Sequence, residues 1–305
     1  MSLASSEIES FGSYLKAQGK QASTVESYCR DAGRFADYLA QHKLPVNLVE
    51  PQTLESYSSY LRHDLEEKHN SVRRAIIGVR QFFRYLSELG KISSSPFDEV
   101  PLPQRDDRLS TTLKTSQLQL LYQACRQDAS GLKAERDLSI ISLLAREGLK
   151  VSEIIGLNWS DLLSAGDDEH SLRIDGTRKR SITVDAVTGG HLSAYRKEHR
   201  NWQIPSEFMF IAFKGREAAA KLPKMTRHGI KFMLYERGEE CGIEGLNAER
   251  LRHCAIVHLM ERGLTMEQIM NHLGLRRPGL IAKHFAQESL TAQSQNENPV
   301  VDTPQ

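Results

Sequence analysis

The sequence predicts a mainly α-helical protein of two domains: a four-helix bundle at the N-terminus and a larger helical domain that contains a small β-hairpin. Three observations support this prediction. Apolar residues recur at helical spacing through residues 6–92, a stretch rich in proline and serine interrupts the pattern at 93–115, and the helical period returns from residue 116. The chain has 305 residues, of which 39% are hydrophobic, and this is enough for two cores of ordinary size.

The N-terminal domain is predicted to contain four helices. The first covers residues 8–15, where apolar side chains are three or four residues apart. The hydroxyl of Ser23 or Thr24 can cap the second helix. Pro51 begins the third, and the fourth ends at Gly90. Four helices of this length form a small bundle.

The second domain is predicted to combine helices with one β-hairpin. Its first signal is RDLSIISLLAREGLKVSEIIGLNWSDLL, which predicts a buried helix, a glycine break and a second helix. In the stretch HSLRIDGTRKRSITVD, apolar and polar residues alternate on both sides of a Gly-Thr turn, which predicts a short β-hairpin. The predicted divisions are an N-terminal domain at 1–92, a linker at 93–115, a second domain at 116–290 and a disordered tail at 291–305.

Composition and charge exclude several classes of protein. The formal net charge is +1, so a nucleic-acid partner would have to be recognised by local basic clusters. Four cysteines are scattered without metal-ligand spacing, so we expect reduced thiols rather than a metal site, and we expect no cofactor. We find no basic and apolar leader and no apolar run of roughly 18 residues, so we expect a cytoplasmic protein with no membrane partner.

Basic residues gather in three places. The predicted fourth helix carries arginines beside aromatic residues that would face the core. The hairpin turn adds Arg178, Lys179 and Arg180, and the third cluster includes Lys214, Arg216, Lys221, Lys224, Arg227 and Lys231. A clamp around a duplex would use all three clusters for phosphate contacts, whereas any one cluster alone is more typical of a solvated face. The candidate DNA contacts in these clusters are Arg73, Arg74, Arg80, Arg84, Arg178, Lys179, Lys224 and Arg227.

Two distant segments resemble the catalytic domain of the tyrosine recombinases, the phage integrase and Xer class. These segments are RDLSIISLLAREGLKVSEIIGLNWSDL and LNAERLRHCAIVHLMERGLTMEQIMNHLGLRRPGLIAKHF. The N-terminal domain resembles the SAM-like core-binding bundle of the same family in SVRRAIIGVRQFFRYL and in the spacing of Thr24, Tyr28, Asp31, Phe35, Tyr38 and Leu39. The resemblance covers residues 6–290 and implies the tyrosine recombinase fold.

The resemblance also implies a function. Members of the family clamp double-stranded DNA between two domains and cleave a strand, without a metal, through a phosphotyrosine. This chemistry needs cations around the phosphate, because negative charge builds up on its non-bridging oxygens. In the family two arginines and a histidine hold those oxygens, a hairpin lysine protonates the leaving oxygen, and a tyrosine attacks.

This sequence departs from the family at most of those positions. The six positions are occupied by Lys150, Lys179, Glu249, Arg252, Leu275 and His284. Lys150 keeps the charge of an arginine but loses its planar fork, Glu249 would repel a phosphate, and Leu275 cannot donate a hydrogen bond. His284 stands where the nucleophile is expected, and no tyrosine follows Tyr235. Of the six positions, Arg252 alone clearly keeps the family's residue. Because His284 replaces the expected tyrosine, we predict that the nucleophile has been lost.

Three assignments stay open. Lys179 lies in the hairpin turn, but the family's lysine aligns nearer Gly176. Arg252 either contacts phosphate or forms a structural pair with Glu153. His284 either marks the lost nucleophile or itself attacks phosphate to form a phosphoramidate. The remaining candidate DNA contacts are Lys150 and Arg252.

We therefore predict a DNA-binding protein of the tyrosine recombinase fold that no longer cleaves DNA. Its expected partner is double-stranded DNA at the nucleoid, bound as a monomer or dimer or beside an active recombinase. Regulation of transcription or an architectural role would suit such a protein. The alternatives are an active recombinase or integrase with an atypical active site, and a protein-interaction module that has given up DNA.

Overall fold

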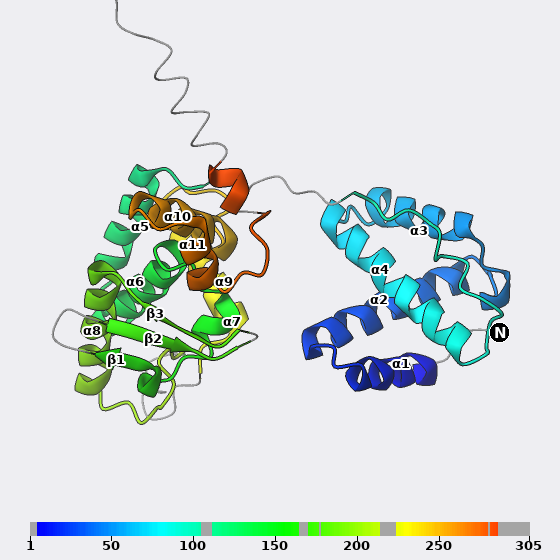
Figure 1. Cartoon of the computed structure of the whole chain (residues 1–305). Helices are drawn as coiled ribbons and strands as arrows, with labels where there is room; N and C mark the ends of the chain where they lie inside the picture. Colours follow the sequence, from blue (N-terminus) through cyan, green and yellow to red (C-terminus); the bar gives the residue numbers. More distant parts are fainter. Residues whose placement is uncertain are drawn as a thin grey trace, which may run out of the picture. The chain divides into compact units, whose positions relative to one another are not determined.

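The chain divides into two compact units, Met1–Arg108 and Leu109–Gln305 (Figure 1). The computed structural model describes residues 5–104, 112–164, 170–176, 178–213, 224–279 and 281–285. These residues are mostly helical, with one small sheet, so the predicted mainly α-helical class is confirmed.

Unit 1 is a bundle of four helices, as the sequence predicts. It contains α1 (Ser5–Ala17), α2 (Ala22–Gln41), the 3-10 turn η1 (Val46–Leu48), α3 (Pro51–His63) and α4 (His69–Glu88). Helix α2 packs against both α1 and α4, and α3 packs against α4. The apolar residues of α4 recur at helical spacing from Val72 to Leu86 and are buried, so this helix is central to the bundle.

Aromatic side chains fill the core of unit 1. The ring of Phe97 lies 4.6 Å from that of Phe83 and 6.0 Å from that of Phe35, and Phe97 is fully buried. Phe97 falls in the stretch that the sequence predicts to be a linker. The buried ring of Phe97 fixes this stretch to the bundle, although the serines and prolines around it are exposed or only partly buried. The first part of the predicted linker therefore belongs to unit 1.

Unit 2 combines helices with an antiparallel sheet. Its helices are α5 (Thr115–Arg126), α6 (Gly131–Ala145), α7 (Val151–Ile154), α8 (Ala186–Asn201), α9 (Arg227–Glu240), α10 (Ala248–Glu261) and α11 (Met266–Leu273). The 3-10 turn η2 (Trp159–Asp161) leads into β1 (Leu162–Ser164), β2 (His170–Ile174) and β3 (Arg180–Thr183), in the spatial order β1-β2-β3. Leu172 pairs with Leu162 on one side and Ile182 on the other, and all three are buried. Strands β2 and β3 are the predicted hairpin.

The predicted second helix after the glycine break is one turn long. The chain leaves α7 at Ile154 and continues into η2 and β1. The backbone N–H of Asn158 donates to Oδ2 of Asp161 over 2.9 Å, and Asn158 forms an isolated β-bridge with Phe208. A short polar side chain that bonds to nearby backbone competes with helix hydrogen bonds. The apolar spacing of this stretch therefore does not produce a longer helix.

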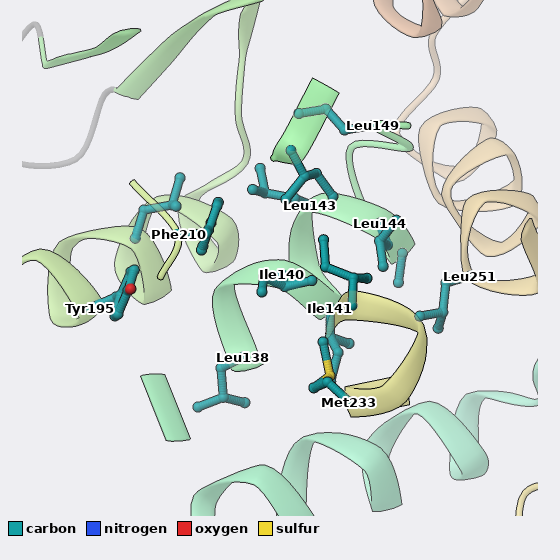
Figure 2. Packing of buried hydrophobic residues seen from close by; sticks show 14 of the residues in the cluster. Leu138, Ile140, Ile141, Leu143, Leu144, Leu149, Tyr195, Phe210, Met233 and Leu251 are labelled. Atoms are coloured by element: carbon teal, nitrogen blue, oxygen red, sulfur yellow. The ribbon is translucent and has the colours of Figure 1, made fainter. Parts of the chain in front are cut away.

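Helix α6 lies at the centre of the unit 2 core. Residues 138–145 are all buried. Figure 2 shows Tyr195 and Phe210 on one side of this helix and Met233 and Leu251 on the other. A helix that is apolar on almost every side is buried on every side, as the sequence predicts for this segment.

Gly148 allows α10 and α11 to approach the end of α6. Its φ of +65° lies in the left-handed region that favours glycine. A Cβ atom at this position would lie 2.3 Å from Cδ2 of Leu273 in α11 and 3.1 Å from Cβ of Ala255 in α10. Glycine therefore brings the start of α7 next to α10 and α11, where the candidate site lies.

We expect Phe97→Ala to lower the free energy of unfolding of unit 1 by about 3–5 kcal/mol, the range for losing a buried phenylalanine ring. Leu89→Ala, at an exposed position after α4, is the control and should change it by less than about 0.5 kcal/mol. Hydrogen exchange of the α4 amides measures unit 1. Trp159 and Trp202 both lie in unit 2, so their fluorescence during urea unfolding reports on unit 2 separately. Equal protection of α4 in the two variants would contradict the core role of Phe97.

Candidate active site

Contacts in unit 2 bring several of the six sequence-predicted positions together. Lys150 is the N-terminal cap residue of α7. Arg252 of α10 donates from Nε to the carbonyl of Gly148 over 2.9 Å. Arg178, in the hairpin, donates from Nη1 to the carbonyl of Leu275 over 2.5 Å. The start of α7, the β2–β3 hairpin, α10 and Leu275, two residues after α11, therefore surround one site.

A buried ion pair between Glu153 and Arg180 holds these elements. Arg180 donates from Nη1 to Oε1 of Glu153 over 2.9 Å and from Nη2 to Oε2 over 3.2 Å. Glu153 Oε2 also accepts the backbone N–H of Lys150 over 2.8 Å. Nε of Arg180 donates to the carbonyl of His272 over 2.7 Å. The pair thus connects α7, β3 and the end of α11.

The surroundings of Glu153 keep it ionised. Burial alone would raise its pKa, but the hydrogen bonds from Arg180 and from the Lys150 backbone hold the pKa below its ordinary value. Gly274 makes room for this arrangement: its φ is +63°, and a Cβ there would lie 2.8 Å from Nη1 of Arg180. The carboxylate is therefore committed to Arg180, and the alternative pair of Arg252 with Glu153 is not formed.

Sequence reasoning did not select Arg180 as a site residue. The available signal was strand alternation, because Arg180 and Ile182 lie on the same side of β3 and Ile182 is buried. An arginine on the inner side of a strand needs an acid close by. Glu153, the acidic residue of the first family motif, was the candidate partner for this arginine.

The carboxylate of Glu249 lies next to the guanidinium of Arg252. Oε2 of Glu249 lies 3.4 Å from Nη1 of Arg252, and Oε1 of Glu249 lies 3.6 Å from Nε2 of His253. The hydrogen bond with His253, followed by the charge of Arg252, holds the pKa of Glu249 below its ordinary value, although burial opposes this. The positive face that Arg252 presents is therefore partly neutralised by a residue of its own helix.

His284 lies inside this site. It is buried, and its ring centroid lies 5.7 Å from that of His253 with the rings almost perpendicular. Nε2 of His284 has no hydrogen-bond partner among the described residues. Burial, and then the proximity of His253, lower the pKa of His284, so its imidazole is neutral at neutral pH. Leu275 packs nearby among apolar side chains of α10 and α11 and supplies only its backbone carbonyl.

The other predicted cations of unit 2 lie outside this cluster of contacts. The side chain of Lys179 is 83% exposed and lies 3.6 Å from Asp175. Nζ of Lys224 lies 4.4 Å from the ring centroid of Phe208. Arg227, the first residue of α9, is exposed and has no ion pair among the described residues. Three further residues of the predicted basic cluster, Lys214, Arg216 and Lys221, lie outside the described residues.

The four predicted arginines of α4 are all held within unit 1. Arg74 donates to both oxygens of the buried Asp31, over 3.1 and 3.2 Å. The other three donate to the stretch that follows the bundle. Their acceptors are the Pro103 carbonyl for Arg73 (3.0 Å), the Val100 and Asp98 carbonyls for Arg80 (3.0 and 2.6 Å) and Oδ1 of Asp98 for Arg84 (2.7 Å). Each of these side chains is therefore engaged by an acceptor of unit 1.

No cluster of three or more histidine, cysteine, aspartate or glutamate side chains is arranged to hold a metal ion in the part of the chain that the structure describes. Within the same ranges, none of the helices combines the length and apolar character that a membrane crossing needs.

Two family models match the chain. The model described as the phage integrase family matches residues 111–288, and the model described as the phage integrase N-terminal SAM-like domain matches residues 8–90. Together they span both units. Their boundaries agree with the order of motifs in the sequence, with a helical bundle first and the candidate site in the second unit.

Relatives and solved structures match over nearly the whole chain. Tyrosine recombinase XerD of Listeria monocytogenes serotype 4b (strain F2365) is 27% identical over 283 residues, covering 88% of this chain and 89% of the relative. Tyrosine recombinase XerC of Staphylococcus aureus (strain MRSA252) is 25% identical over 281 residues, covering 90% of each. The post-cleavage complex of XerH site-specific recombinase with palindromic difH substrate has a TM-score of 0.71 at 16% identity, covering 97% of this chain and 85% of that one. This structural likeness confirms the predicted fold.

We expect Arg180→Ala to lower the free energy of unfolding of unit 2 by about 3–5 kcal/mol at neutral pH, because it leaves the Glu153 carboxylate buried without its main partner. The pKa of Glu153 is depressed in the folded chain, so the stability it contributes is complete above the ordinary carboxyl range and is lost as the pH falls. The difference between wild type and Arg180→Ala should therefore shrink below about pH 4. Urea unfolding followed by tryptophan fluorescence at several pH values measures it.

Arg173→Ala is the matched control, because Arg173 pairs with Asp161 through a half-exposed guanidinium on β2. Its cost should stay below about 1 kcal/mol. A loss in Arg180→Ala that is no larger than in Arg173→Ala, or that does not depend on pH, would contradict the central role of the Glu153–Arg180 pair.

Proposed function

Because the chain belongs to the phage integrase family, we propose that it binds duplex DNA with the tyrosine recombinase fold but does not cleave and rejoin it. Its role would be that of a sequence-specific regulator or an architectural factor on chromosomal DNA in the cytoplasm. The observation that carries this proposal is His284, a buried neutral imidazole at the position where the resemblance expects the nucleophile. No tyrosine follows Tyr235 in the sequence.

The surroundings of His284 argue against a histidine nucleophile. An imidazole nitrogen can form a phosphoramidate, but it must reach the phosphorus and be oriented by a second group. Nε2 of His284 is buried and has no orienting hydrogen bond among the described residues. The neighbouring ring of His253 meets it edge to face, and the side chain of Leu275 cannot donate a hydrogen bond to a phosphate oxygen.

The charge around the site also argues against cleavage. A transition state with extra negative charge on phosphate needs donors, and loss of one such donor costs about 3–4 kcal/mol in comparable sites. Lys150 supplies charge without a bidentate fork. Glu249 adds negative charge 3.4 Å from Arg252, the arginine that is kept. Losses of this size at several positions amount to many orders of magnitude in rate.

Cations that are still available support binding without cleavage. Lys179 is highly exposed, and Arg227 and Lys231 are exposed on α9 without an ion pair among the described residues. Arg252 donates to the carbonyl of Gly148, two residues before Lys150 in the chain. Phosphate contacts of this kind give affinity and register, while a helix face in the major groove can read bases. The solved relative is a recombinase bound to its DNA substrate, so duplex DNA is the partner that we propose, with self-association on DNA or pairing with an active recombinase.

We expect no covalent adduct when the wild-type chain meets a nicked duplex that would trap one. Its DNA complexes should dissociate fully in denaturing detergent, and electrophoresis measures this. His284→Tyr alone should also form no adduct, because Glu249 and Leu275 still leave the phosphate without its donors. An acid-labile adduct on His284 in the wild-type chain would instead establish the alternative, an active recombinase with an atypical site.

A restored variant tests whether the scaffold is still competent. It combines Lys150→Arg, Glu249→His, Leu275→His and His284→Tyr. Detergent-resistant adducts in this variant, together with none in the wild type, would show that side chains alone have removed the chemistry. Complete absence of DNA binding by the wild type would refute the proposed function and favour a protein-interaction module.

We expect Glu249→Gln to raise DNA affinity several-fold and to steepen its dependence on salt, because Arg252 is then free to contact a phosphate. The control is Glu261→Gln, which makes the same change of charge at the exposed far end of α10. Fluorescence anisotropy across a range of salt concentrations measures both. Equal effects of the two substitutions would mean that net charge alone is responsible and that Arg252 does not contact DNA.

A further inference from the structure

The stretch 97–104, here called the strap, lies along α4 of unit 1. Phe97 anchors one end in the aromatic core. Beyond it, Asp98 and Glu99 are exposed, Val100 and Leu102 pack against the unit 1 core, and oxygen atoms of the strap accept hydrogen bonds from α4. The accepting atoms are the carbonyls of Asp98, Val100, Pro103 and Gln104 and the carboxylate of Asp98.

The donors form one row on α4. They are His69, Arg73, Arg80 and Arg84. Positions separated by 4, 7 and 11 residues fall on one face of a helix, so the row is a stripe of donors about 22 Å long at 1.5 Å per residue, and three of the four are arginines. Arg74, one residue away from this face, binds Asp31 instead and is not part of the row. The strap therefore follows this face of the helix from His69 to Arg84, and Arg84 remains exposed.

Polar contacts and two partly buried side chains, Val100 and Leu102, hold the far part of the strap. An open pocket of about 310 Å³ lies beside Val100–Pro103 and is also lined by residues of α3 and by Ile76 of α4. Leu54 and Ile76 form its apolar walls, and Arg62 and Ser58, which are hydrogen-bonded to each other, line its polar side. The strap beyond Phe97 is therefore attached by the α4 donors and by Val100 and Leu102, with a pocket left beside it.

The donors that hold the strap are those that a DNA phosphate would require. Arg80 uses both terminal nitrogens on two carbonyls, the arrangement with which arginine grips phosphate bidentately. A bond from arginine to an anionic phosphate oxygen is stronger than a bond to a neutral carbonyl. One N–H cannot serve both acceptors fully, so the strap and DNA compete for the same row.

We propose that the strap is an autoinhibitory contact, in which residues 98–104 occupy the basic face of α4 and duplex DNA displaces them while Phe97 stays anchored. This inference rests on the proposed DNA binding and specifies how unit 1 takes part in it. It explains how a chain with net charge +1 keeps a stripe of cations from binding anions without selectivity. Displacement frees Arg73, Arg80 and Arg84 together, so unit 1 adds its phosphate contacts only when DNA is in place.

The test uses the full-length chain and a fluorescently labelled duplex of mixed sequence. Asp98→Asn removes the carboxylate that holds Arg84, and Glu99→Gln makes the same change of charge at the next exposed residue, for which no contact with α4 is found among the described residues. We expect Asp98→Asn to raise affinity about threefold or more beyond Glu99→Gln and to steepen the salt dependence by about one phosphate contact. In an Arg84→Ala background the difference between the two substitutions should disappear.

Arg80→Ala provides an independent test of whether DNA binds the α4 donors. If DNA takes over the row, this variant binds more weakly and its salt dependence falls by about one contact. Equal affinities of Asp98→Asn and Glu99→Gln, or an unchanged salt dependence in Arg80→Ala, would overturn the strap as an autoinhibitory contact while leaving DNA binding in place. A wild-type chain that binds no DNA at all would refute both the strap and the proposed function.

Discussion

The candidate site of unit 2 depends on one buried ion pair, Glu153 with Arg180. Removing two charges from water costs free energy unless their remaining donors and acceptors are also hydrogen-bonded. Here Glu153 also accepts the backbone N–H that starts α7, and Arg180 also reaches the carbonyl of His272 at the end of α11. Three segments that are distant in the sequence therefore share two side chains, and the positions of Lys150 and of the hairpin follow from that sharing.

Several of the basic residues that the sequence singles out are engaged by oxygens of their own chain. In unit 1 the arginines of α4 bind carbonyls and acids, and in unit 2 Arg252 is flanked by Glu249. The number of basic residues therefore overstates the positive charge available to a partner. A guanidinium that is already hydrogen-bonded must break that bond before it can contact the partner. What distinguishes Arg227 and Lys179 from the others is their exposure rather than their charge.

The fold was largely predictable because its signals are local. Helical spacing, the hairpin alternation and Pro51 each act over a few residues, and the order of motifs predicted which distant positions would meet. The partners of Arg80 and Arg252 were not predictable, because each donates to a backbone carbonyl, which leaves no mark in the sequence. Phe97 was missed for a related reason: one buried ring outweighs the polar composition of its neighbours.

Anchoring of Phe97 in the bundle also affects the connection between the units. While the strap is bound, the connection begins after residue 104, whereas release of residues 98–104 adds seven residues to it. Seven extended residues add at most about 24 Å of reach. The effective concentration of one tethered binding module at the site of another falls as the tether grows beyond the span it must cover. The few hydrogen bonds along α4 would thus also set how strongly DNA binding by one unit promotes binding by the other.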